Sequence, residues 1–404
     1  MDSDAFSSIL STLFVASLVL FLLYRYMTST FTYFSERGIP GPKPIPIFGN
    51  LWGIWRVSLP DHDRNLVKKY GKIFGYFDGS NPSLWVTDPE FIKAIFVKDF
   101  DHFTNRRNIT FESKVVRRMV SSARGQEWKD IRSSITPAFT TGKIKRLIPL
   151  LGERVFLTEG FQFFIRLLEN LIKERKESEQ KYQDFVEAAT ETITDYTKEV
   201  DGKSSVLFLL AGFDTTATTL TNIIFLLALN PEIQNRLHQE IKNKLKISGE
   251  VNHDILIDFP YIDQVINEVL RVYPPVPRVE RECNKDVTYN GIEIKKGTMI
   301  TVPSFALHYD PDSGAPITKL NVTRTLFFRL EWGLRNCVGM RFAMEEIKIA
   351  LCTIVSQFRF FRVRETPMQF DKGFIQVTQP VNAIVGIERR PTLAEPQQQT
   401  ETEK

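Results

Sequence analysis

The heptapeptide GLRNCVG, residues 333–339, places a cysteine between two glycines and directly before a predicted helix. The free N–H groups at a helix N-terminus stabilise negative charge, which lowers the pKa of a thiol and favours a thiolate that ligates a metal. Gly339 lets the backbone approach a flat cofactor closely, and Arg335 stands where it can reach an anionic group beside the metal. From these residues alone, a buried structural cysteine explains Cys337 equally well.

An apolar helix is predicted upstream over residues 205–229, ending at an Asn-Pro pair. It contains Gly212, Asp214, Thr215 and Thr216, and a carboxylate in such a helix is costly unless it is paired or functional. This cluster could open the helix and pass protons to a buried site. Two other interpretations stand beside it: a second membrane span with polar packing residues, and a core helix whose threonines bond to their own backbone.

A third predicted helix, over residues 260–273, carries apolar residues at three- and four-residue spacing along one face. Glu268 and Arg271 are three residues apart, so they share a face of this helix. A surface ion pair would contribute little to stability. Because both residues lie beside the apolar stripe, we expect a buried, structural pair.

The N-terminal segment contains no charge from Phe6 to Leu23, which is long enough to cross the hydrocarbon core of a membrane. Basic residues follow this segment and acidic residues precede it, which favours a retained anchor with the rest of the chain in the cytosol. A cleaved signal peptide fits less well, because no basic region precedes the apolar run. A proline-rich stretch, residues 38–46, predicts a stiff, extended spacer between this anchor and the body of the protein.

The composition fits a large folded body that works in a reducing compartment. Of 404 residues, 43% are hydrophobic and only three are cysteines, so a disulfide framework is not expected. The net charge of +4, with acids and bases well mixed, argues against a nucleic-acid surface. Helix dominates the expected elements, with helices at 64–70, 90–100, 126–135, 161–198, 232–245 and 339–356. Short strands are expected at 72–77, 83–87, 286–294 and 298–302.

Together these motifs resemble the cytochrome P-450 haem-thiolate monooxygenases of the microsomal type, and most closely their third animal family and its nematode relatives. The resemblance covers most of the chain and includes the anchor, the proline-rich hinge and the order and spacing of the motifs. The motifs are WKDIR at 128–132, AGFDTT at 211–216, EVLR at 268–271 and the cysteine loop. The fold that it implies is mainly α with small β-sheets (α+β), preceded by a transmembrane anchor.

The resemblance also implies a role for each matching residue. Cys337 would be the axial thiolate ligand of a haem b iron, donating electron density that favours O–O cleavage. Asp214 and Thr215 would deliver protons to the dioxygen being activated, and Glu268 and Arg271 would lock the structure behind the haem. The haem contacts, mostly to its propionates, would come from Arg106, Trp128, Arg132, Arg281, Arg335 and Gly339.

The activity implied is insertion of one oxygen atom from O2 into a lipophilic small molecule. Electrons would come from NADPH through the flavoprotein reductase, with cytochrome b5 as an optional second donor. The location implied is the endoplasmic reticulum membrane, with a single N-terminal span and a cytosolic catalytic part. The alternatives from other classes are an inactive truncated relative that cannot hold haem productively, and a membrane protein with two spans.

The expected organisation is an anchor over 1–27, a linker and hinge over 28–50, a haem domain over 51–390 and a disordered tail over 391–404. Two places depart from the family pattern. Only residues 133–210 separate the Trp128 motif from the 211–216 motif, so about a hundred residues, a small domain's worth, are expected to be missing near 150–160. The meander is also shortened over 312–332, where Arg324 would complete the Glu268–Arg271 network and residues 330–332 replace the usual start of the cysteine loop.

Overall fold

The computed structural model describes the backbone at residues 3–107, 120–142, 203–248, 251, 253–309, 335–363, 368–370, 377–378 and 380–391. Several predictions therefore lie outside the described residues: the helices within 161–198, Arg324, residues 330–332, most of the polar tail and both places where segments are expected to be missing. Within the described part the fold is helical with small sheets, and the predicted fold class is confirmed.

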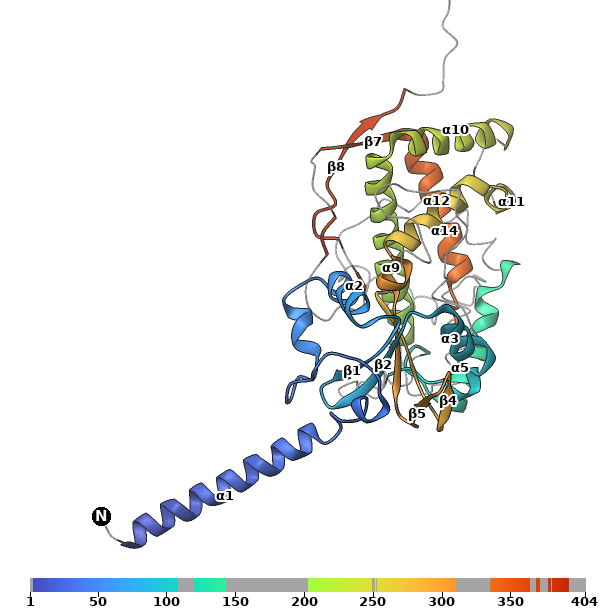
Figure 1. Cartoon of the computed structure of the whole chain (residues 1–404). Coiled ribbons are helices and arrows are strands. Elements are labelled where there is room, and N and C mark those ends of the chain that lie inside the picture. The colour runs from blue at the N-terminus through green and yellow to red at the C-terminus, as the bar shows by residue number, and fades with distance from the viewer. Residues whose placement is uncertain are drawn as a thin grey trace, which may run out of the picture.

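Helix α1, Ser3–Thr28, projects away from the rest of the molecule (Figure 1). Within it, Ser8–Thr28 is long and apolar enough to cross a membrane, and none of that window is buried inside the protein. A second helix, α9 (Lys203–Leu229), passes the same test over Ala211–Leu229, but half of that window is buried. It packs against several neighbouring helices, as a core helix of a globular protein does.

The proline-rich hinge is fixed to the first strand of the body. Strand β1, Ile73–Asp78, donates a hydrogen bond from Gly75 N to Pro40 O at 2.8 Å. Gly41 lies so close that a Cβ atom there would come within 2.3 Å of Gly75 O. The predicted spacer is therefore docked on the sheet, because two glycines allow the backbones to touch.

The main sheet has four strands in the order β1-β2-β6-β3. β1 pairs with β2 (Asn81–Val86) in an antiparallel hairpin, β2 pairs in parallel with β6 (Met299–Pro303), and β6 is antiparallel to β3 (Arg278–Glu282). One face is covered by α2 (Leu59–Tyr70), which begins at Ser58, whose hydroxyl accepts from Asp61 N. The sheet thus joins two stretches of chain that are about two hundred residues apart.

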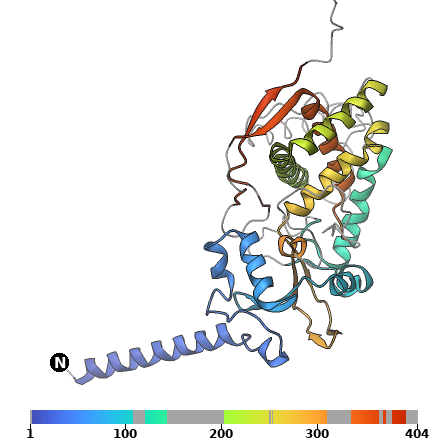
Figure 2. The same cartoon turned by 45° about the horizontal axis from the view of Figure 1, so that its top comes forward.

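The helical layer surrounds α9 (Figure 2). It consists of α10 (Pro231–Ser248), α11 (His253–Ile257), α12 (Pro260–Val272) and α14 (Met340–Gln357). Their apolar stripes form one core cluster that contains Leu237, Ile262 and Leu351. Glu240 of α10 accepts hydrogen bonds from Tyr261 N and Ile262 N at 3.0 Å each, which satisfies free donors at the start of α12.

Smaller elements complete the described fold. They are η1 (Ser35–Arg37), η2 (Leu51–Trp55), α3 (Pro89–Lys93), η3 (Ala94–Lys98), η4 (Phe100–His102), α5 (Gly125–Ile135), η5 (Thr136–Phe139), β4 (Val287–Tyr289), β5 (Ile292–Ile294), α13 (Ser304–His308), β7 (Phe358–Arg362) and β8 (Val385–Arg389). The single helix expected over 90–100 is wrong in part, because the chain passes from α-helix to a π-turn after Lys93. Strand β3 and the β7–β8 pair were not predicted.

Candidate functional site

Cys337 lies in the turn immediately before α14, whose N-cap is Gly339, and its thiol is exposed and in no disulfide. The predicted position of the cysteine at a helix N-terminus is therefore found. Gly339 has a φ of −88°, so its conformation does not require glycine. A Cβ there would lie in ordinary contact with Phe139, 3.5 Å away.

Arg335, two residues before the cysteine, is almost completely buried. Its guanidinium donates to four backbone carbonyls, those of Thr104 (2.6 Å), Val120 (3.3 Å), Ser121 (3.1 Å) and Ala123 (2.8 Å). It also stacks on the ring of Trp128, 4.8 Å from its centroid. Trp128 is itself buried against Phe100, so α5 supplies the platform on which Arg335 rests.

Arg281 of β3 is also buried, with its guanidinium 4.6 Å from the centre of the Phe96 ring. Its Nη1 donates to Glu280 O at 2.9 Å. Among the described residues, the Nε atoms of Arg281 and Arg335 are buried with no hydrogen-bond partner. Unpartnered buried donors are rare, and here they mark a place that suits an acceptor group.

The charges that shift the pKa values of Arg281 and Arg335 are those of other arginines. Burial, together with the neighbouring Arg106, Arg124 and Arg132, lowers the pKa of Arg335 to about 9. Burial and the same Arg106, with Arg335, hold the pKa of Arg281 well below its usual range. Arginines that repel one another in a buried site fit a bound anion such as a carboxylate, because a negative group would restore their usual pKa values.

Arg132 was predicted to contact the propionates, but the structure shows it bound to the cysteine loop. Its two terminal nitrogens donate to Asn336 O and Asn336 Oδ1, each at 2.7 Å. Arg132 therefore ties α5 to the residue preceding Cys337. Its charge still contributes to the field around Arg335.

Asp214 and Thr215 lie on α9, which packs against α14. The helix is continuous from Lys203 to Leu229, so the expected opening at Gly212 is not present. Thr215 Oγ1 donates to Ala211 O at 2.6 Å, the back-bonded arrangement considered among the alternatives. On the facing helix, burial raises the pKa of Glu346 to about 6, and the hydroxyl of Thr216 offsets part of that rise.

Glu268 and Arg271 form the buried pair that their spacing predicts. Arg271 Nε and Nη2 donate to the two carboxylate oxygens of Glu268 at 2.8 Å each. Arg271 Nη1 also donates to His308 O at 3.1 Å, and His308 Nδ1 lies 2.9 Å from Arg271 O. The pair thus joins α12 to α13.

The sequence reasoning missed the acids that surround the arginines. Arg107 binds Asp78 and Glu280, and Arg124 Nη2 donates to Glu282 Oε1 at 2.6 Å. The alternating charges of residues 278–282 were the available signal. An alternation of this kind indicates a strand with different partners on its two faces.

A free cysteine thus lies at the N-terminus of α14, in the same loop as Arg335, one of two buried arginines with donors that have no partner among the described residues. The chain belongs to the cytochrome P450 family, whose model matches residues 39–156, 156–313 and 332–385. The chain is 31% identical over 481 residues to cytochrome P450 3A6 of Oryctolagus cuniculus, an alignment that covers 92% of this chain and 95% of the relative. It is 30% identical over 480 residues to cytochrome P450 3A9 of Rattus norvegicus, covering 91% and 95%.

Membership in this family makes the chain a haem-thiolate monooxygenase in general, with a haem cofactor. The residues present fit a haem, because the buried arginines suit its two carboxylates and the thiol suits its iron. Both alignments are longer than the 404 residues of the chain, so they contain positions at which the chain has no residue. Matches to the family model also break at residue 156 and between 313 and 332.

Proposed function

We propose that this protein is a microsomal monooxygenase that inserts one oxygen atom from O2 into a lipophilic small molecule. Its electrons come from NADPH through the flavoprotein reductase, with cytochrome b5 as an optional second donor. The observation that carries the proposal is the pair of buried, unpartnered Nε atoms on Arg281 and Arg335 beside the Cys337 loop. The relatives of the third family, matched over nine-tenths of the chain, support the same class of reaction.

The haem, when bound, supplies the redox chemistry, and the residues around it have separate roles. Cys337 holds the iron as a thiolate, favoured by the N-terminus of α14. Arg106, Arg281 and Arg335 hold the propionates, Trp128 supports Arg335, and Arg132 fixes the cysteine loop through Asn336. Gly339 leaves the start of α14 without a side chain.

Asp214 and Thr215 hold and release the protons that the reaction consumes. The Thr215 hydroxyl donates to Ala211 O at 2.6 Å, so it has to turn away from that carbonyl before it gives its proton to one neighbour and accepts another proton in return. Glu268 and Arg271 keep α12 and α13 in place behind the site. Arg324 is proposed to join them, as in the family pattern.

The membrane is the second partner that we propose. α1 spans the membrane of the endoplasmic reticulum, and the docked hinge holds the body against its cytosolic side. The support for this is the fully exposed apolar surface of α1 together with the Pro40–Gly75 hydrogen bond. A lipophilic substrate would then reach the protein from the lipid phase.

The deciding experiment compares two cysteines of the full chain. The protein is reduced, carbon monoxide is added and the Soret band is recorded. Wild type and Cys283→Ser, which alters a buried cysteine outside the cysteine loop, are expected to show the red-shifted band of thiolate-ligated haem. Cys337→Ser is expected to lose it. The relatives found by comparison do not support the alternative of an inactive protein. A wild type that takes up no haem would favour that alternative over the proposed function.

We further propose that segments near 150–160 and 312–332 present in relatives are missing here. The breaks in the family match at 156 and between 313 and 332 support this. Sequencing the transcript across those codons tests it. A single transcript species without inserted sequence at either place would show that this chain is the normal product.

A further inference from the structure

The segment 105–107 runs antiparallel to β3 in a defined register. Asn105 and Glu282 form an isolated antiparallel bridge, and Glu282 N donates to Asn105 O at 2.8 Å. Continuing this register by one residue places Arg106 opposite Arg281. A further residue places Arg107 opposite Glu280, where Arg107 Nε and Nη2 donate to the two carboxylate oxygens at 2.7 Å each.

The charge pairs on the two faces of this strand pairing differ: they attract on one face and repel on the other. Successive side chains of a strand point to opposite faces, so Arg278, Glu280 and Glu282 share one face of β3 and Arg281 lies on the other. On the first face an arginine meets a carboxylate. On the second, Arg106 meets Arg281, and like charges directly opposite one another destabilise a strand pair.

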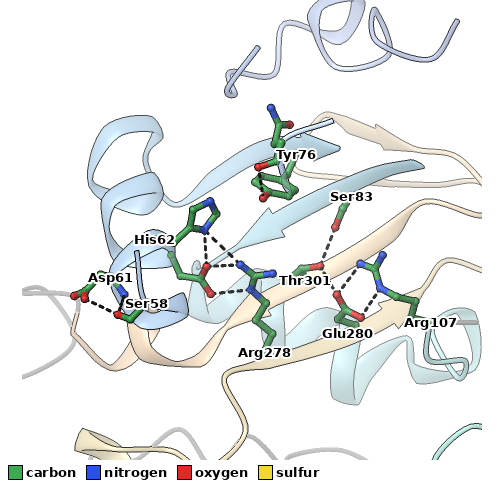
Figure 3. Close-up of polar contacts among 11 residues, drawn as sticks. Ser58, Asp61, His62, Tyr76, Ser83, Arg107, Arg278, Glu280 and Thr301 are labelled. Carbon is green, nitrogen blue, oxygen red and sulfur yellow. Dashed lines mark hydrogen bonds and ion pairs between the residues drawn. The ribbon is translucent and has the colours of Figure 1, made fainter. Parts of the chain in front are cut away.

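Further contacts hold the favourable face together (Figure 3). Arg107 Nη2 donates to Asp78 Oδ2 at 2.6 Å. Thr301 Oγ1 donates to Glu280 Oε1 at 3.4 Å. The Thr301 hydroxyl also lies 2.8 Å from that of Ser83. The segment that carries Arg106 is therefore fastened to three of the four strands through Arg107 and Glu280.

We propose that Glu280, with Arg107 and Asp78, is a positioning network that holds Arg106 and Arg281 side by side for the carboxylates of the bound haem. This inference rests on the proposed function, because it takes the haem as the anion. Without the network, repulsion between Arg106 and Arg281 separates the segment from β3. The three residues of the network do not contact the haem carboxylates themselves. They act by holding the neighbouring Arg106 and Arg281 in place.

The test compares two carboxylates that each bind an arginine through two hydrogen bonds, Glu280 of β3 and Asp63 of α2. Asp63 binds Arg278 of β3, with Arg278 Nε at 2.8 Å and Nη2 at 2.5 Å from its oxygens, and lies on α2. Haem transfer from the full-length protein to excess apomyoglobin is measured for wild type, Glu280→Gln and Asp63→Asn. Glu280→Gln is expected to release haem about tenfold faster, because a charge-assisted bidentate pair is lost, whereas Asp63→Asn is expected to keep the wild-type rate.

A second readout separates positioning from general stability. The resonance Raman bands of propionate bending are expected to shift in Glu280→Gln and to stay in place in Asp63→Asn. If Glu280→Gln fails to fold, Arg107→Lys is compared with Arg278→Lys, since lysine keeps the charge and loses the bidentate geometry. Equal haem release within the matched pair overturns the inference while the proposed function stands. A wild type that binds no haem overturns both.

Discussion

Arg281 and Arg335 show at the scale of single residues what the site requires. Each is buried with a donor unpartnered among the described residues, and burial, together with repulsion from Arg106, lowers both pKa values. A bound carboxylate would stabilise the charged form of both arginines and raise their pKa values again. Binding an anion would therefore also offset the repulsion between the arginines. The place of Arg335 beside the cysteine was predictable from the motif, whereas Arg281 was expected only from the family resemblance. The number of arginines around them was not, because Arg124 belongs to none of the motifs.

Removing one hydroxyl of α9 tests the proton-delivery role. Thr215→Ala is expected to lower product formed per NADPH consumed by about tenfold or more, with peroxide released instead, since a general acid–base group contributes at least that much. Thr221→Ala is the control, because Thr221 Oγ1 makes the same kind of bond, to Ala217 O at 2.9 Å. Unchanged coupling in Thr215→Ala would contradict the role.

Glu346 should make stability depend on pH. Burial raises its pKa from 4.5 to about 6, so the folded state holds the proton more tightly than the unfolded chain. Stability from this group is full below pH 4.5 and is lost as pH rises through 6. Glu346→Gln should therefore gain about 2 kcal/mol over wild type between pH 4.5 and 7.5, at 1.36 kcal/mol per pKa unit.

Urea unfolding of the haem-free protein at the two pH values measures this gain. The control variant is Glu388→Gln on the exposed side of β8, where burial is absent. If the unfolding free energy of Glu346→Gln equals that of the wild type at both pH values, the Glu346 carboxyl is not the source of the pH dependence.

At the scale of elements, the long helices in the described part of the chain and the strands predicted at 72–77, 83–87, 286–294 and 298–302 are found, whereas the charged strand β3 and the β7–β8 pair were not predicted. The helices over 205–229 and 260–273 carry strong apolar patterns, and the structure places both within a residue or two of the predicted ends. Strand β3 has five residues, four of them charged, so it shows no apolar alternation. β3 is a strand because it pairs with β6. Its own five residues give no sign of this partner, which lies about twenty residues further along the chain.

The hinge gives a prediction for one such element. Gly41→Ala should displace the hinge from β1, because the new Cβ would overlap Gly75 O. Limited proteolysis is then expected to cut within residues 38–46 several times faster than in wild type. Gly142→Ala serves as control, since a Cβ there meets no described residue within 4 Å. An unchanged cleavage rate in Gly41→Ala would show that the hinge is not held by this contact.

At the scale of the whole molecule, an apolar patch extends the membrane-facing surface beyond α1. It consists of Ile47, Phe48, Trp52, Trp55 and Val57, all exposed, with Trp55 64% exposed. Aromatic side chains of this kind favour the membrane–water interface. The patch follows the docked hinge, so we expect it to rest on the lipid surface when α1 spans the membrane.

Tryptophan quenching in vesicles that contain brominated lipids measures this contact. Quenching is expected in the full-length wild type and should fall by more than about half in the double variant Trp52→Phe and Trp55→Phe, which removes the interfacial indoles. Trp85→Phe, which alters a fully buried indole, should leave it unchanged. Equal quenching in all three proteins would place the patch away from the lipid.

The strand order β1-β2-β6-β3 also bears on how the protein is made. α1 leaves the ribosome before the strands, and the pairing of β3 with β6 is completed only after residue 303. At about 5–20 residues per second, the β1–β2 hairpin waits roughly 10–40 s with the edge of β2 unpaired. With α1 in the membrane as proposed, the nascent chain would be tethered there during that interval while the edge of β2 stays unpaired, which makes this the stage at which aggregation is most expected and chaperone binding most useful.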